Sequence, residues 1–133
     1  MTPLIIIQTT FPMAHNIAPL CQSLIDGKMA ICIKEFAPTK SHYFWNGAIE
    51  KSLEVILHIK TYKDFFSTVE EMILKAHPYD TPEIIAIPVD AVTKGYQQWQ
   101  TPLCLHPINQ LVHPQCCLRS HYWFLVGKES MHH

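Results

Sequence analysis

The chain lacks the features that mark several large classes of protein. It has no apolar run near the roughly 20 residues that a membrane span needs. It also has no basic start followed by a small-residue cleavage site, so we expect no signal peptide. Its five cysteines form no Cys-x-x-Cys pair, which is typical of reduced thiols. These absences predict a cytoplasmic protein that does not engage a membrane.

An excess of charge of one sign is missing as well. The formal net charge is −1, the isoelectric point is near 6.7, and no arginine precedes Arg119. A nucleic-acid-binding surface needs a basic patch, so we expect no nucleic-acid partner.

Recognisable catalytic motifs are also absent. The chain contains no Gly-x-Gly-x-x-Gly, Gly-x-Ser-x-Gly or His-Glu-x-x-His pattern, and nothing marks a nucleophile or a phosphate-binding loop. The sequence therefore predicts a protein that is not an enzyme and requires no cofactor.

The composition that remains is that of an ordinary globular protein. With 133 residues and 48% hydrophobic side chains, the chain can bury a core without disulfide bonds. Nine histidines are the one excess, and they are compatible with a metal site, a pH response or no special role.

Hydrophobic periodicity predicts four strands and two main helices. β-Branched and alternating segments indicate strands over residues 4–9, 29–36, 53–60 and 84–89, whereas three- and four-residue steps indicate helices over 14–25 and 65–76. A short helix or turn is expected over 96–99. Asn46-Gly47 predicts a tight hairpin between the second and third strands.

Capping residues refine the helix ends. Asn16 as N-cap would place Pro19 in the first turn, where its missing N–H costs nothing, and Gly27 stands where a left-handed residue just past the helix is expected. Asp64 is expected to cap the second helix.

The order β-α-β-β-α-β predicts an α+β fold, the ferredoxin-like split βαβ sandwich with an antiparallel sheet. Residues 1–102 are assigned to this domain and residues 103–133 to a C-terminal extension of unknown role. The aromatic run before Asn46 predicts a long hairpin, and a long two-stranded ribbon needs a partner to pack against.

The loop from His77 to Glu83 carries the most chemistry. It places an imidazole, a phenol and two carboxylates between Pro78 and Pro82, at the start of an apolar strand. Proline restricts its own φ and the residue before it, so the loop is stiff. A stiff polar loop suits a ligand site or a subunit contact.

Three long segments resemble the CutA divalent-cation tolerance family. The resemblance is carried by Tyr43 to Glu50, Glu54 to Thr61 and His77 to Val89, with Tyr96 and Trp99 closing the match. It implies a ferredoxin-like, trimer-forming subunit whose long hairpin wraps a neighbour and whose strand edges pair between subunits. It also implies a link to copper and other divalent ions, without an established catalytic activity.

The resemblance also bears on metal binding. In a copper-binding member of the family the ligands are a cysteine near the end of the first strand and two adjacent histidines, which align with Thr9, Ala76 and His77. Only His77 is retained as a metal ligand, so a Cu²⁺ or other divalent-cation site there is expected to be weak. The alternative is a loop histidine that hydrogen-bonds to the backbone.

A polar pocket at a subunit boundary is a second interpretation of this region. We expect it to bind a small molecule or anion through Trp45, Glu50, Lys60, His77, Tyr79 and Glu83. The alternatives are a hydrogen-bonded trimer seam with an ion pair between Lys60 and Glu83, and a small enzyme that uses His77 and Glu83 as acid and base.

The C-terminal extension holds zinc-type side chains at spacings that match no standard zinc module, namely His106, His113, Cys116, Cys117 and His121. We expect Tyr122 to Val126 to pack as a strand or plug, with the cysteines acting as small hydrophobic side chains.

Overall fold

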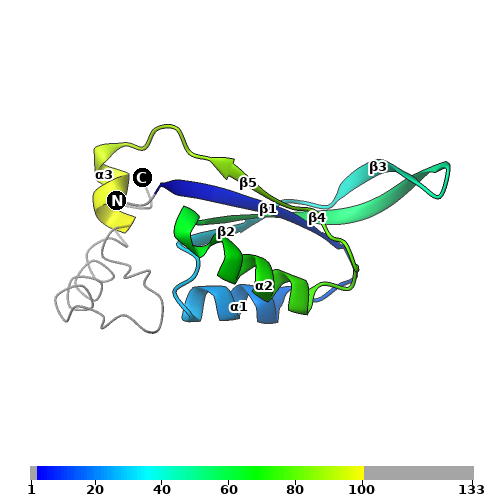
Figure 1. Ribbon diagram of the computed structural model, residues 1–133, viewed down its shortest axis with the longest axis horizontal. Coiled ribbons are helices and arrows are strands. Elements are labelled where there is room, and N and C mark those ends of the chain that lie inside the picture. Colours follow the sequence, from blue (N-terminus) through cyan, green and yellow to red (C-terminus); the bar gives the residue numbers. More distant parts are fainter. Residues whose placement is uncertain (1–2, 101–133) are drawn as a thin grey trace. The chain divides into compact units, whose positions relative to one another are not determined.

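The computed structural model describes residues 3–100, which belong to two units. The first unit, the body, ends at Pro88, and the second begins at Val89. In the body, two helices lie on one face of an antiparallel sheet (Figure 1). The described part of the second unit contains one helix, α3 (Lys94–Gln100), which confirms the short helix expected around Tyr96. The domain boundary expected after residue 102 lies outside the described residues and stays a prediction.

The elements of the body follow the expected order, with one strand divided in two. They are β1 (Leu4–Pro12), α1 (Ala18–Asp26), β2 (Cys32–Glu35), β3 (Thr39–Trp45), β4 (Ala48–Tyr62), a 3-10 turn (Lys63–Phe65), α2 (Phe66–Ala76) and β5 (Ile84–Pro88). The strands lie in the order β2-β4-β1-β5, and β3 pairs with the other half of β4. The predicted α+β ferredoxin-like sandwich is confirmed.

The core lies between the sheet and the two helices. Residues of β1 alternate between the sheet faces, and Ile7 and Phe11 are fully buried on the helix side. Directly across from Ile7 on β4 lies Ile59, which is equally buried. The helices contribute fully buried apolar side chains to the same layer, namely Leu24, Val69 and Ile73.

The opposite side of the sheet, which we call the open face, carries the alternate residues. It presents Ile6, Gln8, Ile56, His58 and Lys60 from β1 and β4, and Ile85 and Ile87 from β5. Their shared face follows from the register, because Gln8 pairs with His58 on one side and with Ile85 on the other. Both helices of the body lie on the other face.

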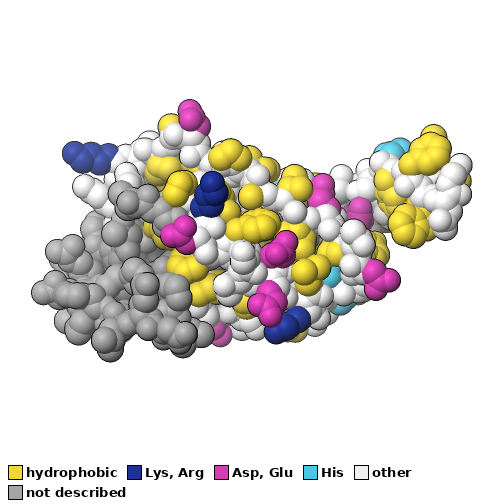
Figure 2. All heavy atoms as spheres, viewed as in Figure 1, with side chains coloured by type: hydrophobic (Ala, Val, Ile, Leu, Met, Phe, Trp, Pro, Cys, Tyr) yellow, Lys and Arg dark blue, Asp and Glu magenta, His cyan; other side chains and the backbone are white. Residues whose placement is uncertain are grey.

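The β3–β4 hairpin extends well beyond the helices (Figure 1). Its turn is Asn46-Gly47, where φ is 49° and 78°, so both central residues are left-handed as a type I′ turn requires. The predicted hairpin is confirmed. Figure 2 shows hydrophobic side chains gathered at its far end, and the exposed members of this set are Tyr43, Phe44, Trp45 and Ile49.

Strand boundaries differ from the sequence expectation at the second and third strands. The second strand starts at Cys32 rather than Met29, because the N–H groups of Met29 and Ala30 bond to the carbonyl of Leu24 at the end of α1. Pro38, which has no N–H to donate, lies between β2 and β3. The third strand, β4, has 15 residues because it forms both the body and one arm of the hairpin.

Two helix caps also differ. The N-cap of α1 is Ile17 rather than Asn16, although the Asn16 side chain accepts a hydrogen bond from the Ala18 N–H (3.2 Å), and Pro19 does lie in the first turn. The left-handed residue after α1 is Lys28 (φ 61°), not Gly27. Gly27 is needed for space, since a Cβ there would lie 2.9 Å from the Ser23 carbonyl oxygen.

Asp64 does not cap the second helix, contrary to the sequence prediction. It lies inside the 3-10 turn that precedes α2, and the N-cap of α2 is Phe65, with no side-chain hydrogen bond. Phe65 is buried, so its packing into the core decides where the α-helical turns begin.

Candidate functional site

His77 lies at the C-terminal end of α2, with both ring nitrogens hydrogen-bonded to the backbone. Its Nε2 lies 2.6 Å from the Thr10 carbonyl oxygen, and its Nδ1 lies 3.1 Å from the Tyr79 nitrogen. A carbonyl can only accept and an N–H can only donate, so Nε2 carries the proton and Nδ1 accepts. His77 is therefore held as the neutral Nε2–H tautomer, bridging β1 and the loop after α2.

The local sequence explains this position. Proline at 78 disfavours helical geometry in the residue before it, and His77 is extended (φ −83°, ψ 136°), so α2 ends there. Partial burial lowers the pKa of His77, and His15 acts in the same direction. The bond to Thr10 and the charge of Glu54 oppose this lowering, but burial dominates.

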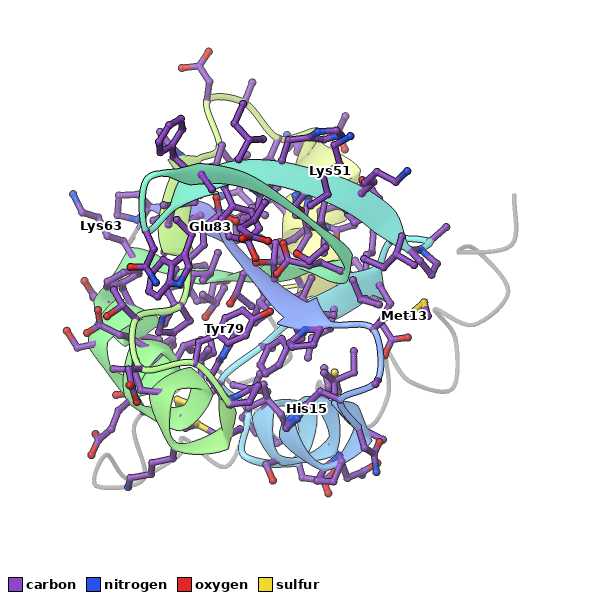
Figure 3. The ribbon with its side chains drawn as sticks, turned by 90° about the vertical axis from the view of Figure 1, so that its right-hand side faces the viewer. Met13, His15, Lys51, Lys63, Tyr79 and Glu83 are labelled. Carbon is purple, nitrogen blue, oxygen red and sulfur yellow. The ribbon has the colours of Figure 1, made fainter. Side chains whose placement is uncertain are left out.

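A column of rings surrounds His77. Phe11 stacks on it at 4.1 Å between ring centres, His15 stacks on Phe11 at 5.3 Å, and Tyr79 lies 5.0 Å from His77. Figure 3 looks onto this end of the body, with Tyr79 and His15 labelled. The column joins β1, the segment before α1 and the loop after α2, so it fixes the loop against the sheet.

Glu54 on β4 accepts a hydrogen bond from the hydroxyl of Tyr79. The Glu54 residue is only 6% exposed, and burial, the nearby carboxylate and the hydrogen bond that Tyr79 donates to it all raise the pKa of Tyr79. Burial is the largest of these causes, and Tyr43 on the hairpin adds a smaller one. The result is a polar contact between the loop and the base of the hairpin.

The donor set around His77 does not fit a tight metal site. Both of its nitrogens have backbone partners, Ala76 offers no donor, and the Thr9 hydroxyl is a poor ligand for copper. The Thr9 hydroxyl is fully buried without a hydrogen-bond partner among residues 3–100. In that same range, no group of three histidine, cysteine or acidic side chains is arranged to hold a metal ion.

Of the six residues expected to line one pocket, the structure brings His77 and Tyr79 into contact and places Trp45 diagonally across the hairpin from Glu50. Trp45 lies at the end of the hairpin, where it pairs with Ala48, and Glu50 pairs with Tyr43. Lys60 lies ten residues further along β4 than Glu50, a separation of about 33 Å in an extended strand. Within one chain these side chains cannot converge.

Lys60 and Glu83 are not opposite each other within one subunit either. Lys60 pairs with Ile6, and Ile6 pairs with Ile87 on β5. Glu83 precedes Ile87 by four residues, about 13 Å along the strand. An ion pair or a shared pocket would therefore need a second subunit.

Two residues of this region were missed at the sequence level. Glu54 belongs by alternation to the outward set of its strand, so the sequence gave no signal of its burial or of its interaction with Tyr79, which lies 25 positions away. Phe11 lies beyond the first strand expected over residues 4–9, yet β1 continues to Pro12. The zinc-type side chains after residue 102 lie outside the described residues and remain a prediction.

No helix within residues 3–100 is long and apolar enough to cross a membrane. The cytoplasmic location expected from the sequence stays a prediction. Some relatives are named for another location: the rice and Arabidopsis relatives are both named as chloroplastic.

Comparison with known proteins gives the family. The divalent-cation tolerance protein CutA of Pyrococcus horikoshii is 34% identical over 72% of this chain and 93% of its own length. The Archaeoglobus fulgidus protein of the same name is 32% identical over 70% of this chain and 90% of its own. The chain spans about half the length of the rice relative, at 31% identity over 73% of this chain.

Solved structures agree with the sequence relatives. The CutA1 structure from Pyrococcus horikoshii covers 74% of this chain and 96% of its own, with a TM-score of 0.67. The Archaeoglobus fulgidus structure, titled a periplasmic divalent cation tolerance protein CutA, covers 77% and 99% with a TM-score of 0.71 and 29% identity. The profile of the CutA1 divalent ion tolerance proteins matches residues 5–102. The chain therefore belongs to the CutA1 divalent ion tolerance family.

Proposed function

We propose that this protein acts as a non-enzymatic homotrimer in the cytoplasm, in the tolerance of or response to divalent metal ions, copper in particular. A ligand or weak metal site lies at the boundary between its subunits. The observation that carries the proposal is the set of isoleucines on the open face of the sheet, which lie around the hydrogen-bonded pair Gln8 and His58.

The open face has the character of an interface rather than of a solvent surface. Ile85 is 44% and Ile87 is 38% exposed, Ile6 lies beside Ile87 on β1, and Ile56 lies on β4 beyond the hydrogen-bonded pair Gln8 and His58. Large contiguous apolar patches on soluble proteins mark contact surfaces. Within the described residues β2, β3 and β5 each pair with only one strand, and edge pairing between subunits would remove the tendency of such edges to aggregate.

The hairpin gives independent support for a partner. It carries exposed aromatic side chains at its end, with Phe44 71% exposed, and a two-stranded ribbon by itself is only marginally stable in water. A neighbouring subunit that packs against the ribbon would bury these rings. In a closed ring of three identical subunits, every hairpin packs against a neighbouring subunit in the same way.

The same arrangement supports a site between subunits. Trp45 and Glu50 on the hairpin are too far from Lys60 within one chain. A hairpin that reaches over a neighbouring subunit can bring them to that subunit's loop from His77 to Glu83. At such a boundary, Lys60 would contact a bound anion and the polar loop would contact a bound small molecule.

The trimer is tested by the mass of the protein in solution. Three chains of 15.3 kDa give about 46 kDa, and we expect light scattering to report that value unchanged over a wide range of protein concentration. A stable species near the mass of one chain would contradict the proposal.

Copper binding is expected to be weak, because His77 would have to give up a backbone hydrogen bond to bind an ion. In a calorimetric titration of the full chain with Cu²⁺ or Zn²⁺, we expect a dissociation constant above about 10 μM for any site that depends on His77. His77→Ala should abolish that component, and Lys75→Ala, an exposed change on α2, should leave it intact. A nanomolar site removed by His77→Ala would contradict the proposal.

Acid–base catalysis by His77 and Glu83 has less support. Both ring nitrogens of His77 are bonded to the backbone, so the imidazole is not free to exchange a proton with a substrate. Nothing in the geometry around it favours this second candidate over a binding role.

A further inference from the structure

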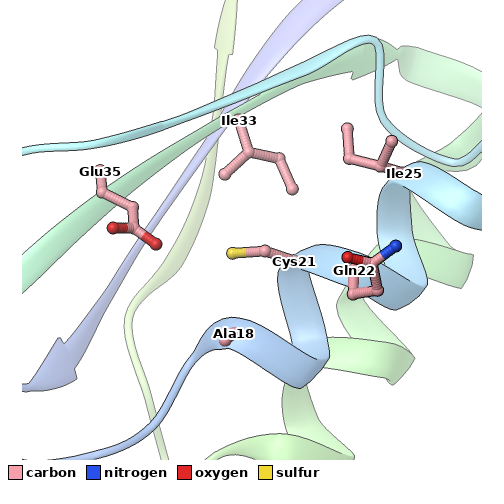
Figure 4. A pocket seen from close by; sticks show the side chains of 6 residues that line it. All are labelled: Ala18, Cys21, Gln22, Ile25, Ile33 and Glu35. Carbon is pink, nitrogen blue, oxygen red and sulfur yellow. The ribbon is translucent and has the colours of Figure 1, made fainter.

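A pocket lies between α1 and the edge strand β2, away from the His77 loop. Its volume is about 560 Å³, and it is open to solvent on one side, because Ala18, Gln22, Ile25 and Glu35 are exposed. Figure 4 shows the side chains that line it, namely Ala18, Cys21, Gln22, Ile25, Ile33 and Glu35.

The spacing of these residues explains why they share one space. Ala18, Cys21, Gln22 and Ile25 recur at three- and four-residue steps and so form one stripe of α1. Ile33 and Glu35 alternate on β2 and therefore point to the same side of the strand. The stripe and the strand face each other across the pocket (Figure 4).

The polar groups of the pocket are acceptors rather than cations. Glu35 offers a carboxylate at one end, and its charge adds to burial in raising the pKa of the Cys21 thiol. Gln22 uses its amide nitrogen to donate to Asp26 (2.8 Å), which leaves its oxygen as an acceptor. No lysine, arginine or histidine is among the lining side chains.

We propose that this pocket binds a small organic monocation, an alkylammonium or arylalkylammonium. The apolar part of such a ligand would pack against Ile25, Ile33 and Ala18, and its ammonium group would bond to Glu35. The inference goes beyond the proposed trimer, because it uses neither the open face nor the hairpin. Since Glu35 is solvent-exposed, one ion pair should improve affinity by only about fivefold.

The rate of alkylation of Cys21 reports ligand binding, because the Cys21 side chain lines the pocket. The full chain is treated with iodoacetamide, a neutral reagent, and alkylation of each cysteine is followed by peptide mass spectrometry. The reference is a short unstructured peptide with one cysteine, added to the same reaction, because Cys32 pairs with Lys60 on the open face that the proposed trimer covers. With about 10 mM n-hexylammonium and a dissociation constant near 1 mM, we expect Cys21 to react about tenfold more slowly. The reference peptide should react at its original rate.

Matched ligands and variants isolate the role of charge. We expect hexan-1-ol to protect Cys21 only about threefold under the same conditions, and hexanoate less than the alcohol. Glu35→Gln should make the amine and the alcohol equivalent, whereas Glu71→Gln, an exposed change on α2, should leave their difference intact. Protection is the ratio of rates with and without ligand in one variant, so a changed reactivity of Cys21 itself cancels.

Three results would overturn the proposal. One is equal protection by hexylammonium and hexan-1-ol in the wild type, which would show an apolar groove without charge selection. Another is an amine preference that survives Glu35→Gln. The third is a Cys21 that no reagent reaches in the folded wild type but that reacts after unfolding, which would mean that protein covers the pocket. None of these results depends on the mass of the assembly, so failure here and failure of the trimer are distinguishable.

Discussion

Phe11→Ala is expected to remove much of the stability of the body, by about 3–5 kcal/mol. Phe11 is fully buried, with its ring stacked between His15 and His77. The substitution leaves a cavity at the point where β1, the segment before α1 and the loop after α2 meet. Since a whole domain is usually stable by only about 5–15 kcal/mol, the loss should be visible as partial unfolding near physiological temperature.

Urea denaturation followed by circular dichroism, at a fixed protein concentration, measures the effect. Phe11→Leu keeps most of the apolar volume and removes the ring stacking, so we expect a smaller loss of about 1–2 kcal/mol and a chain that still folds. Leu74→Ala, on a leucine 47% exposed on α2, is the control and should change stability by less than about 0.5 kcal/mol. If Phe11→Ala resembled this control, the ring column would not hold the loop to the sheet.

The fold was predictable because its main signals are local. The continuous apolar runs of β1 and β5, the helical periodicity before Ala76 and the Asn46-Gly47 turn each act over a few residues, and each matches the structure. The helix ends were less predictable. Asp64 is a residue type that often caps helices, but the burial of Phe65 sets the start of α2. After α1, Lys28 adopts the left-handed conformation, and Gly27 is instead required for its close approach to Ser23.

The site was predictable only where its residues are neighbours in the sequence. His77 and Tyr79 were identified together, and the structure shows them in contact. Glu54 could not be identified, because the residue with which it interacts, Tyr79, comes from a separate loop. The convergence expected of Trp45, Lys60 and Glu83 does not occur within one chain, since sequence spacing carries no information on which subunit a hairpin reaches.

Ile87→Lys is expected to dissociate the trimer. Ile87 lies on the open face beside Ile6, so in the proposed assembly its side chain is buried by a neighbour. Losing that burial costs about 1.5–3 kcal/mol at each interface, which is about one to two orders of magnitude in each dissociation constant. An unpaired ammonium in the contact adds its own desolvation cost. Light scattering at micromolar protein should then show a lower mass than the wild type, and Ile85→Lys, on the same strand and face, should act in the same direction.

Leu74→Lys is the matched control for this change. It introduces the same charge at a leucine of comparable exposure, but on α2, which lies on the other side of the sheet from the open face. We expect this variant to keep the mass of the wild type, and circular dichroism should show that Ile87→Lys remains folded. A folded Ile87→Lys protein with an unchanged trimeric mass would mean that the subunits meet elsewhere. In that case the open face would need another partner to cover its isoleucines, and the placement of a ligand site around His77 at a subunit boundary would lose its support.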